Sequence, residues 1–301
     1  MSGTAAHPTP TAAQWLAGAR PRTLPAAVSP VVAASGLAFF EDGFSAIRAF
    51  LALVVAVALQ IGVNYANDYS DGIRGTDASR VGPLRLVGSG LARPAAVKAA
   101  AFACFGVAGV FGLALVWVSQ QWWLLAVGAA SIVAAWYYTG GRRPYGYRGL
   151  GEVFVFVFFG LVATCGTGFV QTGRVSPALL GTAIGIGSLA CAILVANNLR
   201  DIDGDLAVGK HTLQTRIGDP ATRRLYLILV VLAALIMIVV ASLTSWWALA
   251  AVAGLALIIP ALRTVATGGR GRDLIPVLKT TGLAELAASL GLAVGLVIAR
   301  L

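Results

Sequence analysis

Charged residues are scarce in this 301-residue chain: only 11% of its residues are Asp, Glu, Lys or Arg, and only 12 are acidic. Soluble globular domains carry about 25% charged and 45–50% apolar residues, whereas this chain is 58% hydrophobic with a mean hydropathy of +0.84. The shortage of charge excludes a soluble globular protein. We therefore predict an integral membrane protein and interpret its formal charge of +10 as a topology signal, not as affinity for nucleic acid.

Histidine and cysteine are also rare. The two histidines, His7 and His211, are too few for a multi-histidine metal site. The three cysteines, Cys104, Cys165 and Cys191, lie inside apolar runs, without CxxC spacing and without a histidine nearby. This pattern is typical of small core residues, so we assign the cysteines to packing.

Long runs without charge make up most of the chain. They cover residues 24–40, 49–67, 99–119, 122–138, 153–173, 175–199 and 225–262, and a last run near 280–299 is interrupted only by Glu285. One span needs about 20 apolar residues, so the run 225–262 predicts two helices with a turn near "SLTSWW", like the turn at "SQQWW". We expect an all-α polytopic bundle of about nine transmembrane helices, in which glycine-rich stretches such as "GLAVGLVIA" allow close helix packing.

Basic residues are distributed unevenly among the connections between the predicted spans. With nine spans, alternate connections lie on the same side of the membrane. All but three of the 22 Lys and Arg residues fall on the side of the N-terminus, and the exceptions are Arg48, Arg174 and Arg300. Because basic residues concentrate in cytoplasmic loops, we predict a cell-membrane protein whose N-terminus and long loops face the cytoplasm.

The first residues lack the features of a secretory signal. Residues 1–19 are rich in Ala, Thr and Pro and have neither a basic start nor an apolar core. We expect them to form a disordered cytoplasmic tail. Residues 20–301 are then expected to form a single transmembrane domain.

Half of the twelve acidic residues gather in two matching clusters, each at the end of an apolar run. The first, "NYANDYSDGIRGTDASR", begins at Asn64, and the second, "NNLRDIDGDLAVGK", begins at Asn197. The predicted topology places both on the cytoplasmic face. Helical spacing of i, i+4 or i, i+4, i+7 aligns the members of three sets: Asn67 with Asp71; Asn64 with Asp68 and Asp71; and Asn197 with Asp201 and Asp205.

Carboxylates that stack in this way repel one another unless a cation lies between them. Two facing arrays therefore predict a divalent metal, most naturally Mg²⁺, which prefers oxygen ligands and keeps positions open for phosphate. Basic residues of the same loops have the charge to bind a diphosphate: Arg74, Arg80, Arg85, Arg142, Arg143 and Lys210. For single residues, the alternatives are helix caps or solvated loop acids, such as Asp203, and topogenic arginines.

The two acid motifs resemble those of the UbiA superfamily of membrane prenyltransferases, which are NxxxD with further aspartates and, four helices later, DxxxD. The matching residues are Asn67, Asp68, Asp71 and Asp77 in the first motif and Asp201 and Asp205 in the second; Gly75 occupies the position of the last acid of the simplest NxxxDxxxD form. The variant "NDYSDGIRGTD" is similar to the branch that prenylates 1,4-dihydroxy-2-naphthoate in menaquinone biosynthesis. So are "ARPRTLPAAVSPV", "YYTGGRRPYGYRGLGEVFVFVFFG" and "RDIDGDLAVGKHTL", and the likeness runs from about residue 15 to 220.

The resemblance implies two related four-helix halves plus one helix around a central cavity, and a Mg²⁺-dependent 1,4-dihydroxy-2-naphthoate polyprenyltransferase. Mg²⁺ would stabilise the diphosphate of a polyprenyl diphosphate as a leaving group, and the naphthoate ring would attack the allylic cation with loss of CO₂. The implied metal ligands are Asp68, Asp71, Asp77, Asp201 and Asp205. The implied catalytic residues are these acids, apart from Asp77, together with Asn67. The implied substrate-binding residues are Arg22, Asn64, Tyr138, Arg142, Arg143 and Lys210.

Two other functions stay open from the sequence. Within the enzymes, the acceptor is alternatively another aromatic compound, such as 4-hydroxybenzoate. A divalent-cation or organic-anion transporter is the alternative from another class, but transporter sites lie near the membrane midplane and use intramembrane acids. Only Glu285 lies inside a predicted span, so the sequence favours the enzyme.

Overall fold

The computed structural model describes residues 9–75 and 84–301. These residues form helices and connecting loops, and the described ranges contain no strand. In chain order the helical elements are α1 (Ala12–Ala19), η1 (Pro21–Thr23), α2 (Leu24–Phe40), α3 (Ala46–Arg74), α4 (Pro94–Ser119), α5 (Leu124–Tyr137), η2 (Tyr145–Arg148), α6 (Gly151–Val155), the π-helix η3 (Phe156–Cys165), α7 (Gly166–Thr172), α8 (Pro177–Ala207), α9 (Leu213–Leu243), η4 (Trp246–Leu249), α10 (Ala250–Gly254), η5 (Leu255–Ile258), α11 (Ile259–Ala266), η6 (Gly271–Asp273) and α12 (Leu274–Ile298).

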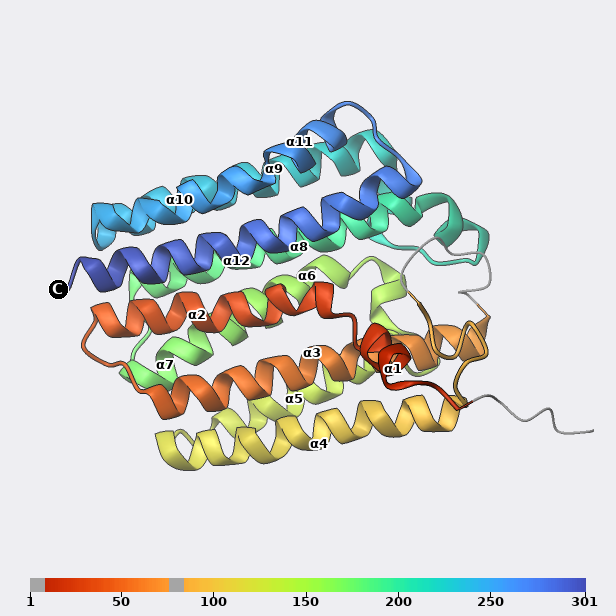
Figure 1. The fold of residues 1–301 in the computed structure, drawn as a ribbon, viewed down its shortest axis with the longest axis horizontal. Helices are drawn as coiled ribbons and strands as arrows, with labels where there is room; N and C mark the ends of the chain where they lie inside the picture. The colour runs from red at the N-terminus through yellow and green to blue at the C-terminus, as the bar shows by residue number, and fades with distance from the viewer. Residues whose placement is uncertain (1–8, 76–83) are drawn as a thin grey trace, which may run out of the picture.

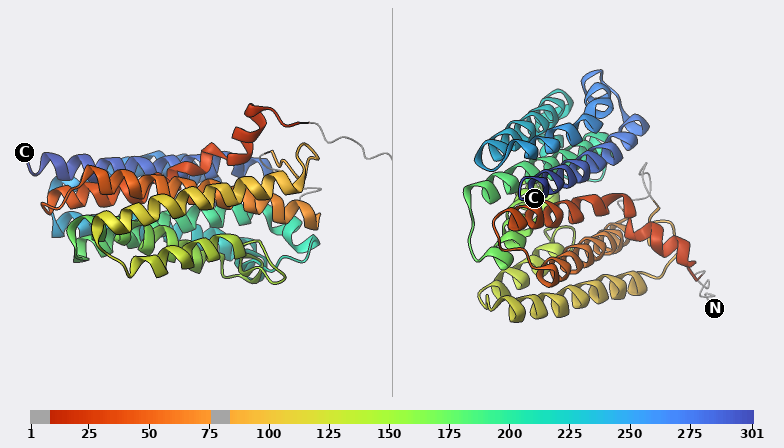
Figure 2. Two further views of the ribbon diagram at one scale, coloured as in Figure 1. Left: turned by 90° about the horizontal axis from the view of Figure 1, so that it is seen from below. Right: turned by 60° about the vertical axis from the view of Figure 1, so that its left-hand side comes forward.

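The prediction of about nine apolar helices is confirmed. Within the described residues, eight helical segments are long and apolar enough to cross a membrane, and the shorter apolar helix α5 completes the set. Figure 1 shows them running side by side along the long axis of the molecule, and Figure 2 shows the same bundle in two further views. α1 and the C-terminus lie at opposite ends of the bundle (Figure 1), as an odd number of spans requires.

Both predicted turns are present. α4 ends at Ser119 and α5 begins at Leu124, with Gln120 in the left-handed conformation at φ 58°. The long run 225–262 is divided after Leu243, where Ser245 accepts a hydrogen bond from the N–H of Trp247 at 3.4 Å. The helices that carry the acid motifs extend beyond their apolar runs, so that the motifs form the last turns of α3 and α8.

The expectation of disorder is wrong for residues 12–19, which form α1. Thr11 and Gln14 make a reciprocal capping box at 2.8 and 3.3 Å, which stabilises the start of a helix. The Trp15 ring meets Tyr65 of α3 edge-on, with ring centroids 5.6 Å apart, and the Tyr65 hydroxyl donates to the Trp15 carbonyl at 2.9 Å. Composition missed this helix because its partner lies about fifty residues further along the chain.

Glycines allow α12 to pack closely in the bundle, as the stretch "GLAVGLVIA" predicts. α12 lies against α2, α8 and α10. A Cβ atom added at Gly291 would lie 2.3 Å from the Ala250 carbonyl oxygen, and one added at Gly295 would lie 2.1 Å from the Trp247 carbonyl oxygen. Both contacts are to backbone, which has little freedom to move away.

The substitution Gly291→Ala is therefore expected to destabilise the bundle. Overpacking a close contact costs about 1–3 kcal/mol, so the thermal unfolding midpoint of the detergent-solubilised protein should fall. Gly109→Ala in α4 is the matched control, because a Cβ there meets nothing within 4 Å and alanine favours a helix over glycine by about 0.5–1 kcal/mol. Equal midpoints for the two variants would contradict this account of the packing.

Candidate active site

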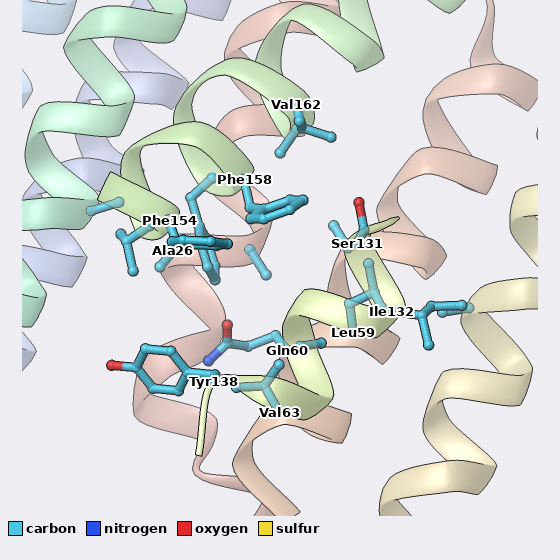
Figure 3. A pocket seen from close by; sticks show the side chains of 18 of the residues that line it. Ala26, Leu59, Gln60, Val63, Ser131, Ile132, Tyr138, Phe154, Phe158 and Val162 are labelled. Atoms are coloured by element: carbon cyan, nitrogen blue, oxygen red, sulfur yellow. The ribbon is translucent and has the colours of Figure 1, made fainter. Parts of the chain in front are cut away.

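A cavity of about 890 Å³ lies inside the bundle, between α2 to α5 on one side and the α6–η3–α7 segment and α8 on the other. Its walls are largely apolar; Figure 3 shows Phe154, Phe158 and Val162 facing Leu59 and Val63 across the open space. Polar side chains line the end formed by the acid-motif turns of α3 and α8: Arg20, Arg22, Thr23, Asn64, Asn67, Asp71, Arg85, Asn197, Asn198, Asp205 and Lys210. The cavity thus joins an ionic mouth to an apolar interior.

Asp71, in the last turn of α3, is the point at which the two motifs meet. Its side chain is 4% exposed and lies 3.4 Å from Arg85 Nη2 and 3.6 Å from Lys210 Nζ. The hydroxyl of Tyr147 donates a hydrogen bond to the same carboxylate. Because Lys210 follows the second motif, its ion pair with Asp71 connects the end of α8 to the end of α3.

Asp68 has a different role in the observed geometry. Its two carboxylate oxygens accept hydrogen bonds from the backbone N–H groups of Leu86 and Val87, at 2.6 and 3.0 Å. The residue is buried but does not line the cavity. Asp68 therefore fixes the turn at Leu86 and Val87 so that Arg85, next to Leu86, reaches Asp71.

The two acids of the second motif are also placed differently. Asp201 is held by a bidentate ion pair with Arg200, with both N···O distances at 2.7 Å. Arg200 also donates to Asn197 Oδ1 at 2.9 Å. Asp205 lines the cavity, and its backbone carbonyl accepts the N–H of Lys210 at 2.8 Å. The turn that ends α8 thereby directs Lys210 towards Asp71.

The asparagines of the first motif connect α3 to neighbouring loops. Asn64 Nδ2 donates to the Ala19 carbonyl and to Thr23 Oγ1, both at 2.9 Å. Asn67 Oδ1 accepts a hydrogen bond from Thr139 Oγ1 at 2.7 Å. Both asparagines line the cavity, so they hold its mouth together and face its contents.

The other substrate-binding candidates divide into two groups. Arg22, Tyr138 and Lys210 line the cavity, whereas Arg142 and Arg143 are exposed and do not line it. The guanidinium of Arg74 donates hydrogen bonds to the carbonyls of Thr139 and Gly141. These bonds fix the loop directly before Arg142 and so set the position of the two arginines. Of the predicted metal ligands, Asp77 lies outside the described residues.

Two tyrosines between α5 and α6, Tyr145 and Tyr147, line the ionic end of the cavity. The residue spacing in the sequence did not indicate them. The Tyr147 ring lies 4.6 Å from Lys210 Nζ and 5.5 Å from the guanidinium carbon of Arg74, close enough for cation–π attraction. Tyr145 donates to the Ala134 carbonyl at 2.8 Å and stacks on Phe154 at 3.9 Å. Burial raises the pKa of the Tyr145 hydroxyl.

Glu152 is a half-buried acid that sequence analysis did not single out. Its Oε1 accepts hydrogen bonds from Gln214 at 2.8 Å and from Asn198 at 3.4 Å. Asn198 also donates to Gln214 Oε1 at 2.9 Å. This network joins the starts of α6 and α9 to the second motif. Glu152 is the single acid of the stretch "GYRGLGE", so no spacing between acids could have pointed to it.

The carboxylates of the motifs fit Mg²⁺ by donor type, since Mg²⁺ prefers hard oxygen ligands and is bound through one or two carboxylates plus substrate phosphates. In the described ranges, no group of three or more His, Cys, Asp or Glu side chains is close enough to hold a metal ion. Cationic side chains instead balance the buried charge, with Arg85 and Lys210 beside Asp71 and Arg200 beside Asp201. Each oxygen of the Asp68 carboxyl group accepts one backbone hydrogen bond, which leaves lone pairs for further contacts, since a carboxylate accepts about four.

Comparison with known proteins agrees with this architecture. The UbiA prenyltransferase family model matches residues 27–273. A 1,4-dihydroxy-2-naphthoate octaprenyltransferase of Mycobacterium leprae is 53% identical over 95% of this chain and 97% of its own length. One of Mycobacterium tuberculosis is 51% identical over 96% of this chain and 98% of its own length, and one of Escherichia coli is 41% identical over 70% of each chain.

Solved structures share the fold at low sequence identity. A UbiA homolog from Aeropyrum pernix in its apo form has a TM-score of 0.68 and 17% identity, covering 92% of this chain and 98% of its own. A UbiA homolog from Archaeoglobus fulgidus bound to DMAPP and Mg²⁺ has a TM-score of 0.63 and 12% identity, covering 92% and 99%. The family model spans most of the bundle and both acid motifs, so the chain belongs to the UbiA prenyltransferase family.

Proposed function

We propose that the chain transfers a polyprenyl group from polyprenyl diphosphate to 1,4-dihydroxy-2-naphthoate, with decarboxylation, in menaquinone biosynthesis. The observation that carries prenyl transfer is the meeting of both acid motifs, through Asp71 and Lys210, at the mouth of an apolar cavity. Such a cavity suits a substrate with an ionic head and a lipid tail. The acceptor is supported by the relatives of this name, which are 51–53% identical over nearly the whole chain.

The diphosphate is assigned to the ionic mouth and the polyprenyl tail to the apolar interior. Arg22, Arg85 and Lys210 line the mouth and supply positive charge to the phosphate oxygens. The residues proposed to hold Mg²⁺ are Asp68, Asp71, Asp201 and Asp205, together with Asp77 outside the described ranges. When bound, Mg²⁺ supplies further neutralisation of the leaving diphosphate.

The reaction balances without a net proton acceptor. The bond between C1 of the prenyl group and the diphosphate oxygen breaks, and the diphosphate leaves with the electron pair. A ring carbon of the naphthoate forms the new C–C bond, and the carboxylate leaves as CO₂ while its bonding pair returns to the ring. Tyr138, Phe154 and Phe158 line the cavity, so their ring faces stabilise the allylic cation and their bulk excludes water.

The active site is proposed to face the cytoplasm. Both acid-motif turns lie at the end of the bundle that carries α1 (Figure 1). In the topology predicted from the sequence, all of the Lys and Arg residues apart from Arg48, Arg174 and Arg300 fall on the side of the N-terminus, and basic residues concentrate on the cytoplasmic side. The proposed enzyme is a multi-pass protein of the cell membrane.

Product formation by purified protein in detergent tests the proposal. We expect a prenylated, decarboxylated naphthoquinol from polyprenyl diphosphate and 1,4-dihydroxy-2-naphthoate with Mg²⁺, and none after chelation by EDTA. Restoring excess Mg²⁺ should restore the activity, which controls for damage by the chelator. If the protein prenylates 4-hydroxybenzoate and ignores the naphthoate, the proposed acceptor is wrong. Equal turnover with EDTA and with Mg²⁺ would exclude the proposed role of the metal in the reaction.

A further inference from the structure

Gln60 presents a buried amide to the cavity, and neither the acid motifs nor the ionic mouth accounts for it. It lies one helical turn before Asn64 on α3, lines the cavity and is 8% exposed. Its Nε2 donates to Thr23 Oγ1 at 3.0 Å. Its Oε1 is buried and has no hydrogen-bond partner among the residues that the structure describes.

The hydrogen bonds around Thr23 fix which way this amide points. The Thr23 hydroxyl has a single proton, which it donates to the Arg20 carbonyl at 2.9 Å. Towards Gln60 and Asn64 the hydroxyl oxygen is therefore an acceptor, and each amide must present its NH₂ group. The carbonyl oxygen of Gln60 is left to face the cavity, and Figure 3 shows it on the side of Phe154 and Phe158.

A buried carbonyl oxygen without a donor is costly, and native proteins rarely leave one unpaired. A ligand that supplies a donor would satisfy Gln60. Of the two proposed substrates, polyprenyl diphosphate has a hydrocarbon tail and acceptor oxygens when ionised, so it has no donor to offer. The naphthoate has two hydroxyl groups. Its 1-hydroxyl is adjacent to the carboxylate and can bond to it internally, which leaves the 4-hydroxyl as the free donor.

We propose that Gln60 Oε1 accepts a hydrogen bond from the 4-hydroxyl of the acceptor and so selects a para-dihydroxy ring. This inference rests on the proposed function. The carboxylate of the acceptor is directed away from Gln60, because two acceptor oxygens repel each other. The ring lies in the space that Gln60, Tyr138, Phe154 and Phe158 enclose (Figure 3). Gln60 is a specificity-determining residue in this arrangement.

The test compares the binding of two acceptors, without prenyl diphosphate, to wild-type protein and to Gln60→Leu. The acceptors are 1,4-dihydroxy-2-naphthoate and 1-hydroxy-2-naphthoate, which lacks the 4-hydroxyl. Wild type should bind the dihydroxy compound about 10-fold more tightly, as one buried hydrogen bond contributes about 1.4 kcal/mol, a factor of ten. Gln60→Leu should reduce this preference to less than about 2-fold. Its KM for polyprenyl diphosphate should change by less than about 2-fold, because the inference gives the prenyl donor no contact with Gln60.

Gln171→Leu is the matched control, because Gln171 is another buried glutamine of the bundle, 5% exposed, that does not line the cavity. It should lower thermal stability and keep the wild-type preference. Gln60→Met serves as the second variant if Gln60→Leu does not fold.

The inference is overturned if the folded Gln60 variant keeps the wild-type preference for the dihydroxy acceptor. Wild-type protein that prenylates the dihydroxy acid but binds both acceptors equally overturns it too and leaves the proposed function intact. Wild-type protein that prenylates neither acceptor overturns both proposals.

Discussion

Asp71→Asn is expected to lower kcat by about 10³-fold or more while the bundle stays folded. Asp71 is the carboxylate that Arg85, Lys210 and Tyr147 surround at the ionic mouth. Asparagine keeps the shape but removes the negative charge that is proposed to bind Mg²⁺ and to hold the two cations in place. Removing one electrostatic group of this kind typically costs about 10²–10³-fold, and loss of the metal adds to this. Steady-state kinetics and thermal unfolding of the same preparation separate the two effects.

Asp42→Asn is the control for the loss of one aspartate. Asp42, in the loop between α2 and α3, pairs with Arg300 and has a side chain that is 73% exposed. Figure 1 shows this loop and the C-terminus at the end of the bundle opposite α1. Exposed pairs contribute about 0–1 kcal/mol, so activity and unfolding midpoint should change little. Normal turnover of Asp71→Asn would contradict both the proposed metal site and the proposed binding of the diphosphate at the ionic mouth.

Hydrophobic runs were sufficient to predict the helices and the meeting of the acid motifs. Charge-free stretches predicted the spans. Because successive connections lie on alternate sides of the membrane, the span order also predicted that both motifs lie at the same end of the bundle, where the structure has Asp71 and Lys210 in contact. Spacing could not separate Asp68 from Asp71, because i, i+4, i+7 positions share one broad helix face. Which carboxylate faces the cavity is decided by the turn at Leu86 and Val87. That contact is set by tertiary packing.

The residues that sequence analysis missed carry no local signal. Gln60 lies inside an apolar run, and its importance comes from Thr23, which belongs to another element. Glu152 is one acid at a helix start, and its partners Asn198 and Gln214 lie 46 and 62 residues further along the chain. Arg142 and Arg143 lie on the exposed side of their loop and do not line the cavity, a placement that spacing did not indicate, and their role in substrate binding stays a prediction. Composition and residue spacing describe one helix at a time, so they do not predict which helices and loops pack against one another.

Lys210→Met is expected to lower kcat/KM for polyprenyl diphosphate by about 10²-fold or more. Lys210 is 6% exposed, lies 3.6 Å from Asp71 and sits 4.6 Å from the centre of the Tyr147 ring. Removing one partner of a buried ion pair costs about 3–5 kcal/mol, because the other charge stays buried without compensation. The same side chain is proposed to bind the diphosphate, so the KM for the prenyl donor should rise and the KM for the naphthoate should change less.

Two further variants distinguish loss of charge from loss of packing. Lys210→Arg keeps the charge but replaces a compact ammonium by a planar guanidinium, so it should recover part of the activity. Lys98→Met is the control, because Lys98 is exposed and its ammonium lies 5.7 Å from the Tyr69 ring, outside the cavity lining; its activity should stay within about 2-fold of wild type. If Lys210→Met lowers kcat and leaves the KM for the prenyl donor unchanged, Lys210 acts through Asp71 alone. The diphosphate must then be held by Arg22 and Arg85, which are the other cations proposed to bind it.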